Sequence, residues 1–491
     1  MSLSRRRFAL LSTAAAATLA APAIVRTAQA QGWSGPRPKN VILMISDGAG
    51  FHTWTAASYY EFGELGRQVY DRFPVKTLMT TFPLNTSSKP TNDTTPTISY
   101  EPAKAWSLAP GQGDLGGEIT KKKYPNFFAG YEYVKKNYTD SAAAGTALAA
   151  AIKTYNNSIN FDNMGRPVKM VSEFAKSAGK STGVVSSVQI SHATPAAFAA
   201  HNISRNNYAE IGREMIEDGL CDVIMGAGHP MFDNDGRYRA PGSDKAFQYV
   251  GGADTYFKAA TGRTSYQWIE ARADFERLAK GELKLEKPKV LGVAQVHNTL
   301  QFNRSGQGMG NLNANVPDLA TMSLGALEVL ARNEKGFFVM IEGGAVDWAA
   351  HANDTARIVE EQIDFNRAVR AVVAWIERNG GFEQNLLIVT TDHGNGMAYG
   401  PESDRFAFQP VINRGKGQLP DVTWHYDTHT NELVPVWAAG PGAEQLVAAS
   451  TGEDPHTALV GWGDVRRYHD ITDIGRLIIS AVSAEQRASA N

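Results

Sequence analysis

Short apolar runs that each end in a polar turn recur along the chain, and they constrain its fold more than any other feature. The runs are residues 40–46, 183–190, 222–225, 337–341 and 386–391. Apolar runs of this length are typical of strands buried on both faces, as in a parallel sheet. Helical patterns fall between the runs, at residues 142–152, 167–177, 207–217, 319–331 and 356–379. This alternation predicts an α/β fold, with an open, mostly parallel central sheet flanked by helices on both faces.

Two long segments break the alternation of strands and helices. Residues 82–130 are rich in Thr, Ser, Pro and Gly, and residues 230–290 carry Gly, Tyr, Lys and Glu without a steady period. We expect both to be insertions at the edge of the sheet that shape the mouth of a pocket. Residues 31–491 are then one domain that carries two insertions.

The first thirty residues have the pattern of an export signal. Arg5, Arg6 and Arg7 precede a mild apolar run over residues 9–23, and Ala28-Gln29-Ala30 offers a cleavage site before Gln31. Paired arginines ahead of such a run are typical of a twin-arginine signal peptide. The alternative is a membrane-anchoring first helix, for which the run is short. We therefore expect residues 1–30 to engage the twin-arginine export machinery, leaving a periplasmic or secreted protein without a membrane anchor.

Composition excludes several classes of protein. Cys221 is the single cysteine, so an internal disulfide and a thiolate zinc cluster are both impossible. The chain has 48 Lys and Arg against 50 Asp and Glu, a formal net charge of -2. This balance, with no basic tract, argues against nucleic acid as a partner.

Acids and histidines gather where the predicted strands end. Asp47 and the pair Asp392-His393 each follow a strand, and Asp347 lies four residues before His351, on the same face of a helix. Each feature alone is more often a helix cap or a solvated pair. Because ligands bind at the carboxyl ends of parallel strands, their conjunction predicts a zinc site built from carboxylates and imidazoles.

Of the eleven histidines, the sequence singles out His192, His351, His393 and His429. We expect the others to be surface residues or hydrogen-bonded polar groups. His425 is the least certain of these, because it lies near His429 in the chain.

Ser141 is the candidate nucleophile. It follows Asp140 and precedes a run of alanines, so it belongs to the first turn of a helix, where backbone N–H groups favour a phosphate. The alternative is that Asp140 and Ser141 only cap this helix. The chain contains neither a Gly-x-Ser-x-Gly elbow nor a Walker phosphate loop, and residues 306–310 lack the spacing of a dinucleotide site.

Taken together, these motifs resemble those of the alkaline phosphatases over most of residues 31–491. The matching segments, in the family's order, are residues 42–48, residues 139–143, residues 192–195 with Arg205, the set Glu342, Asp347 and His351, the pair Asp392-His393, and His429-Thr430. No single motif is decisive, but six in one order are highly specific. The resemblance implies an alkaline phosphatase-like fold for the predicted domain.

The resemblance also implies two Zn²⁺ ions and one Mg²⁺ ion. The first zinc would be held by Asp347, His351 and His429. The second would be held by Asp47, Asp392 and His393, and would also meet the Ser141 oxygen. The third ion would be held by Asp47, Glu342, Thr194 and His192. Arg205 would grip the phosphate and Asp140 would orient Arg205.

The implied reaction is hydrolysis of phosphate monoesters through a phosphoserine on Ser141, and many relatives are homodimers. His192 and Trp348 differ from the residues that some members carry, so the third ion could be another divalent cation. A phosphodiesterase of the same superfamily is the nearest alternative, although Arg205 argues against it. A sulfatase is less consistent, because Cys221 lies outside the motifs, and a non-catalytic exported zinc-binding protein would give Ser141 no role.

The export signal makes the first testable prediction. Replacing Arg5 and Arg6 by lysine should abolish export, because the twin-arginine machinery recognises the paired arginines. Fractionation of an expressing bacterium should then find the variant in the cytoplasm and the wild type in the periplasm or medium. Undiminished export of the variant would exclude this route.

Overall fold

The structure is a computed structural model that describes residues 33, 35–106, 131–403, 406 and 408–484. The predicted signal segment 1–30 lies outside the described residues, as do residues 107–130 of the first predicted insertion. The twin-arginine signal therefore stays a prediction from the sequence.

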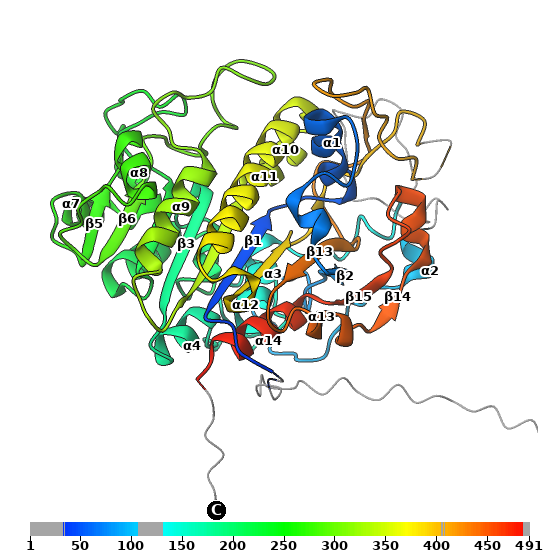
Figure 1. Cartoon of the computed structure of the whole chain (residues 1–491), viewed down its shortest axis with the longest axis horizontal. Helices are drawn as coiled ribbons and strands as arrows, with labels where there is room; N and C mark the ends of the chain where they lie inside the picture. Colours follow the sequence, from blue (N-terminus) through cyan, green and yellow to red (C-terminus); the bar gives the residue numbers. More distant parts are fainter. Residues whose placement is uncertain (1–32, 34, 107–130, 404–405, 407, 485–491) are drawn as a thin grey trace, which may run out of the picture.

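Within the described residues, a central sheet of eleven strands organises the chain (Figure 1). From one edge to the other, the strands are β14 (Gly452–Glu453), β15 (Arg467–Asp470), β2 (Val75–Thr80), β13 (Val434–Ala439), β8 (Asn385–Thr390), β1 (Asn40–Ser46), β7 (Phe337–Gly343), β3 (Ser181–Gln189), β4 (Val223–Ala227), β6 (Lys289–Val293) and β5 (Tyr266–Ile269). The seven strands from β8 to β5 run parallel to one another. β13 runs antiparallel to β8 and β2, and β14 antiparallel to β15. The predicted mostly parallel α/β sheet is confirmed.

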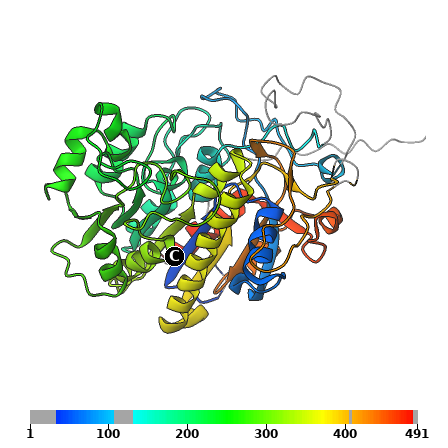
Figure 2. The same cartoon turned by 90° about the horizontal axis from the view of Figure 1, so that it is seen from above.

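Helices cover both faces of the sheet, as the view in Figure 2 shows. One face packs against α1 (Phe51–Phe62), α8 (Arg272–Ala279), α9 (Leu319–Leu330), α10 (Ala345–His351) and α11 (Thr355–Arg378). The other packs against α3 (Ser141–Ala150), α4 (Val171–Ser177), α5 (Ala193–Ala197), α6 (Tyr208–Arg213), α7 (Ala253–Ala260), α13 (Gln445–Ala448) and α14 (Ile471–Val482). Successive side chains of a strand point to opposite faces. Accordingly, Ile42 and Met44 of β1 join one core, and Leu43 joins the other.

The carboxyl ends of the central strands meet at one edge, where the chain turns into helices. β1 leads to α1 and β7 leads to α10, both near the top of Figure 1. Two short antiparallel pairs also follow β8 in the chain: β9 (Gly394–Asn395) with β12 (His429–Thr430), and β10 (Ala398–Tyr399) with β11 (Thr423–Trp424). The pairing of β9 with β12 sets His429 opposite Asn395. Residues far apart in the sequence are thereby brought to one edge.

The two segments that broke the sequence pattern have different structures. Residues 230–290 contribute α7, α8 and β5, which is the outermost strand at one edge of the sheet. The described part of the first segment, residues 82–106, includes α2 (Pro102–Ala105) and packs near residue 454. There the Tyr100 hydroxyl and the Trp106 indole both donate hydrogen bonds to Asp454 Oδ2, at 2.8 and 2.7 Å.

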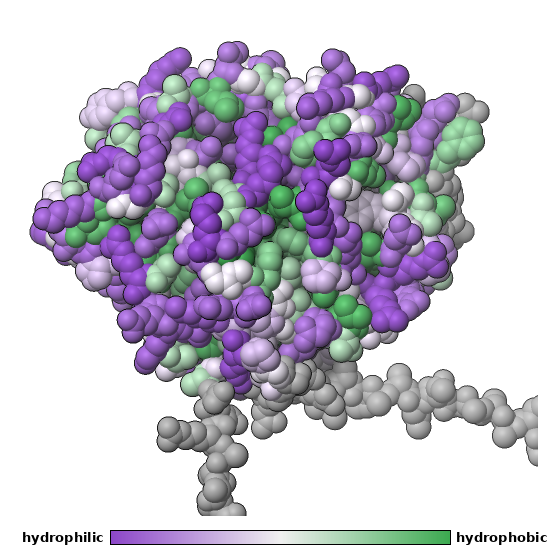
Figure 3. Space-filling view, in the orientation of Figure 1, coloured by the Kyte–Doolittle hydropathy of each residue, from purple (hydrophilic) through white to green (hydrophobic). Residues whose placement is uncertain are grey.

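The remaining short helices lie in connections. They are η1 (Val69–Arg72), η2 (Glu214–Asp218), η3 (Asp244–Val250), η4 (Pro455–Val460) and α12 (Gly381–Gln384). The predicted helix over 207–217 corresponds to α6 followed by η2, in which the winding widens to a π-helix. The face of the molecule drawn in Figure 3 is largely hydrophilic, with apolar side chains scattered over it. Among the described residues, no helix has the length and apolar character that a membrane span needs.

A histidine between two acids makes the stability of the fold depend on pH. His201 Nδ1 lies 3.2 Å from Glu214 Oε1, and His201 Nε2 lies 3.5 Å from Glu173 Oε2 of α4. Burial alone would lower the His201 pKa, but the two carboxylates raise it to about 9. The folded state therefore holds the proton more tightly than the unfolded chain does.

We expect this interaction to stabilise the protein fully below about pH 6.5, the ordinary histidine pKa, and to lose its effect as the pH rises through about 9. His201→Gln should therefore lower the free energy of unfolding at pH 6 and leave it nearly unchanged above pH 9. Denaturant unfolding of both proteins across this range checks the prediction. A difference that does not vary with pH would show that His201 remains neutral.

Candidate active site

Asp347, His351 and His429 form one group of side chains at the edge of the sheet where the carboxyl ends of the central strands meet. α10 supplies Asp347 and His351 one turn apart, and the β9–β12 pair brings His429 to them. The Nε2 atoms of the two histidines are 3.2 Å apart. Each Nε2 atom lies 3.4 Å from one oxygen of the Asp347 carboxylate. Three donor atoms thus converge on one point, as a bound cation requires.

Backbone carbonyls fix how these two imidazoles point. His351 Nδ1 lies 2.7 Å from the Asp427 carbonyl oxygen, and His429 Nδ1 lies 2.8 Å from the Thr139 carbonyl oxygen. A carbonyl only accepts a hydrogen bond, so each Nδ1 must carry the proton. When both rings are neutral, the two Nε2 lone pairs face each other, and either a proton or a metal cation between them relieves this repulsion.

Asp47, Asp392 and His393 form a second, fully buried group. Asp47 follows β1, and Asp392 and His393 follow β8, the strand beside it. His393 Nε2 lies 3.2 Å from Asp392 Oδ2, 3.5 Å from Asp47 Oδ1 and 3.2 Å from the Ser141 hydroxyl. The imidazoles of His393 and His429 stack with ring centroids 3.7 Å apart, so the two groups are adjacent.

A third group shares Asp47 with the second. Its ligand atoms come from Asp47, Glu342 at the end of β7, and His192, which directly precedes α5. Thr194 Oγ1 donates a hydrogen bond to Asp47 Oδ2 at 3.3 Å, and the Ser186 hydroxyl donates one to Glu342. The four residues predicted for a third ion therefore lie together.

The buried acids of these groups need a positive charge beside them. Among the described residues, none makes a hydrogen bond of acceptable geometry to Asp47 Oδ1, Asp392 Oδ2 or Glu342 Oε1. Burial, followed by the neighbouring carboxylates, raises the pKa of Asp47 well above its usual range, that of Asp392 to about 6 and that of Glu342 to about 7. Bound cations would relieve both the burial and the mutual repulsion, so these residues fit metal ions.

Ser141 is the first residue of α3, and Asp140 caps this helix. The Asp140 Oδ1 atom accepts a hydrogen bond from Ala143 N at 3.0 Å. Its Oδ2 atom accepts from Arg205 Nη1 at 3.1 Å and from Asn157 N at 3.0 Å. Asp140 therefore both caps the helix and holds the Arg205 guanidinium. The two roles considered for it from the sequence, helix cap and orienting residue, are compatible.

Ser141, Arg205 and members of the first and third groups open into one cavity of about 440 Å³. It is lined by Ser141, His192, Arg205, Phe302, Asp347, Trp348, His351, Ala352 and His429. The second group lies behind it, because Asp47, Asp392 and His393 are wholly buried. The cavity has room for a phosphoryl group and for more of a substrate beyond it.

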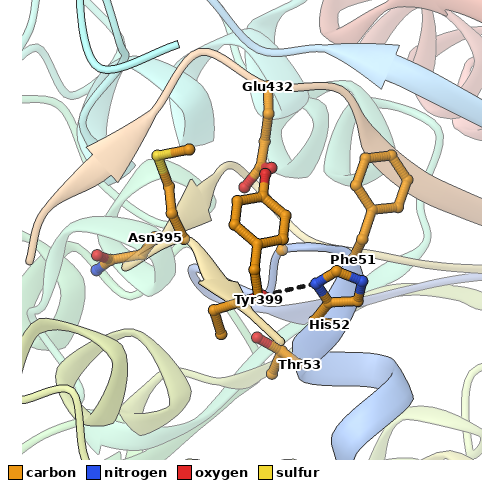
Figure 4. A pocket seen from close by; sticks show the side chains of 9 residues that line it. Phe51, His52, Thr53, Asn395, Tyr399 and Glu432 are labelled. Atoms are coloured by element: carbon orange, nitrogen blue, oxygen red, sulfur yellow. Dashed lines mark hydrogen bonds between the residues drawn. The ribbon is translucent and has the colours of Figure 1, made fainter. Parts of the chain in front are cut away.

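A much smaller cavity of about 10 Å³ lies next to the site (Figure 4). His52, Tyr399 and Glu432 are among its lining residues, and it is just large enough for one water molecule. His52 Nδ1 donates to the Ala398 carbonyl oxygen at 2.6 Å, and Thr430 Oγ1 donates to Glu432 at 2.9 Å. His52 is thus a buried, hydrogen-bonded polar group.

The structure brings together all twelve predicted site residues. Ser141, Asp140 and Arg205 are linked as described, and the nine predicted metal ligands fall in or beside the three groups. Among the described residues, no histidine beyond the four singled out belongs to such a group. His425 instead contacts the Ser403 hydroxyl, at 2.6 Å. Sequence reasoning missed Phe302 and the carbonyls of Thr139 and Asp427, which no side-chain motif indicates.

The fold and the three groups define an α/β protein with three adjacent candidate metal sites beside a serine. A model of the alkaline phosphatase family matches residues 103–420. The chain therefore belongs to the alkaline phosphatase family.

Individual proteins show the same relationship. Alkaline phosphatase 4 of Bacillus subtilis (strain 168) is 35% identical over 261 residues, which cover 53% of this chain and 50% of that protein. Streptomycin-6-phosphate phosphatase of Streptomyces griseus is 27% identical over 496 residues, covering 93% of this chain and 96% of that protein. The solved structure of alkaline phosphatase from the Antarctic bacterium TAB5 has the same fold, with a TM-score of 0.59 and 23% identity over 91% of this chain and 99% of that one. The matches to the two Bacillus subtilis phosphatases span 50% of those proteins.

Gly48, directly after Asp47, gives a test of how the site is held. Its φ is +69°, and a Cβ atom there would lie 2.6 Å from Asp347 Oδ1 and 2.9 Å from Asp347 Cα. Gly48→Ala should therefore displace Asp347 in addition to straining the backbone, which costs about 1–2 kcal/mol. We expect lower metal content and easier removal of the metal by a chelator, measured by elemental analysis.

Gly66→Ala is the matched control, because Gly66 has a φ of +78° with open space around the added methyl group. Backbone strain should lower the melting temperature of this variant, and its metal content should equal that of the wild type. Equal metal content in both variants would contradict the close packing of Gly48 against Asp347.

Proposed function

We propose that this protein hydrolyses phosphate monoesters, with Ser141 as the nucleophile that carries the phosphoryl group between two steps. The observation that carries the proposal is the position of the Ser141 hydroxyl. It lies 3.2 Å from His393 Nε2 and opens into the same cavity as the Arg205 guanidinium. A nucleophile, a metal-binding group and a phosphate-binding cation thus meet at one point, as transfer of a phosphoryl group requires.

Arg205 and the start of α3 are suited to bind the phosphoryl group. The guanidinium presents its donors as a planar fork that matches two phosphate oxygens. Asp140 accepts from Arg205 Nη1, which orients the fork before substrate arrives. The first backbone N–H groups of α3 and the helix dipole add positive potential beside Ser141. A monoester offers more free charged oxygens to such a site than a diester does.

The reaction has two displacements at phosphorus. In the first, the Ser141 Oγ–P bond forms as the bond from phosphorus to the alcohol oxygen breaks, and the proton lost from Oγ is balanced by the proton that the departing alcohol oxygen gains. In the second, a water oxygen bonds to phosphorus, the Oγ–P bond breaks and Ser141 regains a proton. Arg205 holds the phosphoryl oxygens through both steps and offsets their charge.

We propose Zn²⁺ at the first and second groups of ligands. Asp347, His351 and His429 would hold one ion, and Asp47, Asp392 and His393 the other. The mixture of imidazoles and carboxylates without thiolates is typical of catalytic zinc. When bound, zinc acts as a Lewis acid that offsets the negative charge on the reacting oxygens.

We propose Mg²⁺ at the third group, where Asp47, Glu342 and Thr194 offer the oxygen ligands that this ion prefers. His192 adds a nitrogen, which suits zinc or cobalt better than magnesium. Elemental analysis after reconstitution with each ion separately will identify the occupant.

The proposal is tested with purified protein loaded with zinc and magnesium. We expect p-nitrophenyl phosphate to be hydrolysed in strong preference to bis-p-nitrophenyl phosphate, and a chelator to abolish the activity. Ser141→Ala should lower kcat by roughly 10³-fold or more, and should abolish a phosphoenzyme that acid quenching traps in the wild type.

The zinc content of the Ser141→Ala protein is the control, and it should equal that of the wild type because three other side chains hold each ion. Undiminished monoester hydrolysis by this variant would exclude Ser141 as the nucleophile. A preference for the diester would instead indicate a phosphodiesterase. Zinc binding with no ester hydrolysed by the wild type would indicate a non-catalytic metal-binding protein.

A further inference from the structure

The wall of the main cavity is apolar in a way that phosphate binding does not explain. Its polar lining consists of Ser141, Arg205, Asp347 and three histidines, whereas Phe302, Trp348 and Ala352 supply aromatic and methyl surface. A dianionic phosphoryl group gains nothing from such surface. Because the phosphoryl group must lie between Ser141 and Arg205, the apolar wall is left for the alcohol that departs from it.

Trp348 occupies a fixed position in this wall. It follows Asp347 on α10, so the ligand group and the indole are carried by the same turn of helix. Its ring also packs against the His192 imidazole, with centroids 5.7 Å apart. The indole is therefore held beside the polar lining of the cavity.

Phe302 comes from a loop between β6 and α9, and both of its neighbours in the chain are anchored. Asn303 N donates a hydrogen bond to Thr299 Oγ1 at 2.9 Å. Arg304 Nη1 donates to the Gln301 carbonyl oxygen, also at 2.9 Å. The backbone on either side of Phe302 is thereby fixed.

A buried ion pair then ties this loop to α11. Arg304 is only 5% exposed, and its Nη2 atom lies 2.5 Å from Glu360 Oε1. The other Glu360 oxygen accepts from Gly310 N at 2.6 Å, and Arg357 of the same helix donates to the Gly306 carbonyl oxygen at 3.2 Å. Because the backbone that carries Phe302 is fixed in this way, less freedom is lost when a ligand packs on the ring.

We propose that Phe302 and Trp348 form a recognition surface for a planar aromatic ring in the leaving alcohol, so that monoesters carrying such a ring are the preferred substrates. This inference rests on the proposed monoesterase function. Flat rings bury much area against aromatic side chains, and offset or edge-to-face pairs add about 0.5–1.5 kcal/mol, a factor of about two to ten in affinity. A small alkyl alcohol would gain no affinity from aromatic pairing.

Two pairs of substrates isolate the ring. Phenyl phosphate and methyl phosphate differ by an aryl group directly on the reacting oxygen. Adenosine 5′-monophosphate and ribose 5-phosphate share a primary alcohol and differ by a distant base. For Phe302→Ala, we expect kcat/KM to fall about tenfold on the ring-bearing member of at least one pair and less than about twofold on its ring-free partner. The pair that responds shows how far from phosphorus the ring lies.

Three further variants separate the ring from other effects. Phe302→Tyr should retain the wild-type preference, and Phe302→Leu, which keeps apolar bulk in the loop, should lose it. Phe257→Ala removes a half-exposed ring of α7 outside the cavity and should change nothing. Equal losses on both members of both pairs, or no loss on any, would overturn the inference and leave the proposed function standing.

Binding measurements decide the question independently of turnover. The dissociation constants of phenylphosphonate and methylphosphonate are measured by calorimetry on the wild type and on Phe302→Ala. We expect the wild type to bind phenylphosphonate about tenfold more tightly than methylphosphonate and the variant to lose this difference. If the wild type hydrolyses no monoester, the proposed function fails, and equal affinities for the two phosphonates would overturn the recognition surface as well.

Discussion

The electrostatic repulsion among buried carboxylates is the constraint on which the rest of this structure depends. Asp47, Glu342 and Asp392 are completely buried at the ends of β1, β7 and β8, the three strands at the centre of the sheet. An isolated buried carboxylate costs several kcal/mol, and three together cost more, unless cations balance them. Each acid is nevertheless positioned by regular secondary structure. The sheet therefore supplies the rigidity that holds like charges together, and bound metal ions would supply the positive charge that stabilises the arrangement.

Much of the fold could be predicted from the sequence, because the central strands are buried on both faces. A strand in that environment must be apolar throughout, and residues 40–46 were recognised with the same bounds as β1. β5 is a four-residue edge strand with partly exposed side chains, too short to be distinguished from the insertion around it, and it escaped prediction. β2 and β13 also escaped prediction, although most of their side chains are buried. The antiparallel course of β13 depends on pairing with distant strands, which local pattern does not reveal.

The candidate site could be predicted where its ligands lie close together in the sequence. It could not be predicted where backbone carbonyls or the packing of distant segments position a residue. Asp347 and His351 share a helix face, so their spacing alone brings them together. His429 reaches them only through the pairing of β9 with β12, and although the sequence singled out this histidine, placing it with Asp347 and His351 required the family resemblance. Carbonyl groups that orient imidazoles have no signature in a sequence. Phe302 lies in a segment that leads into glycines, and only the buried Arg304–Glu360 pair shows that the segment is anchored.

The sharing of Asp47 between two ligand groups has a thermodynamic consequence. Its carboxylate belongs both to the group with Asp392 and His393 and to the group with His192 and Glu342. An ion at either position alters the charge and orientation of this carboxylate for the other. Binding at the two positions is therefore linked, and each ion changes the affinity for the other by the same factor. A substitution in the third group, such as an imidazole in place of an acid, would in this way alter ion binding at the second group, beside Ser141.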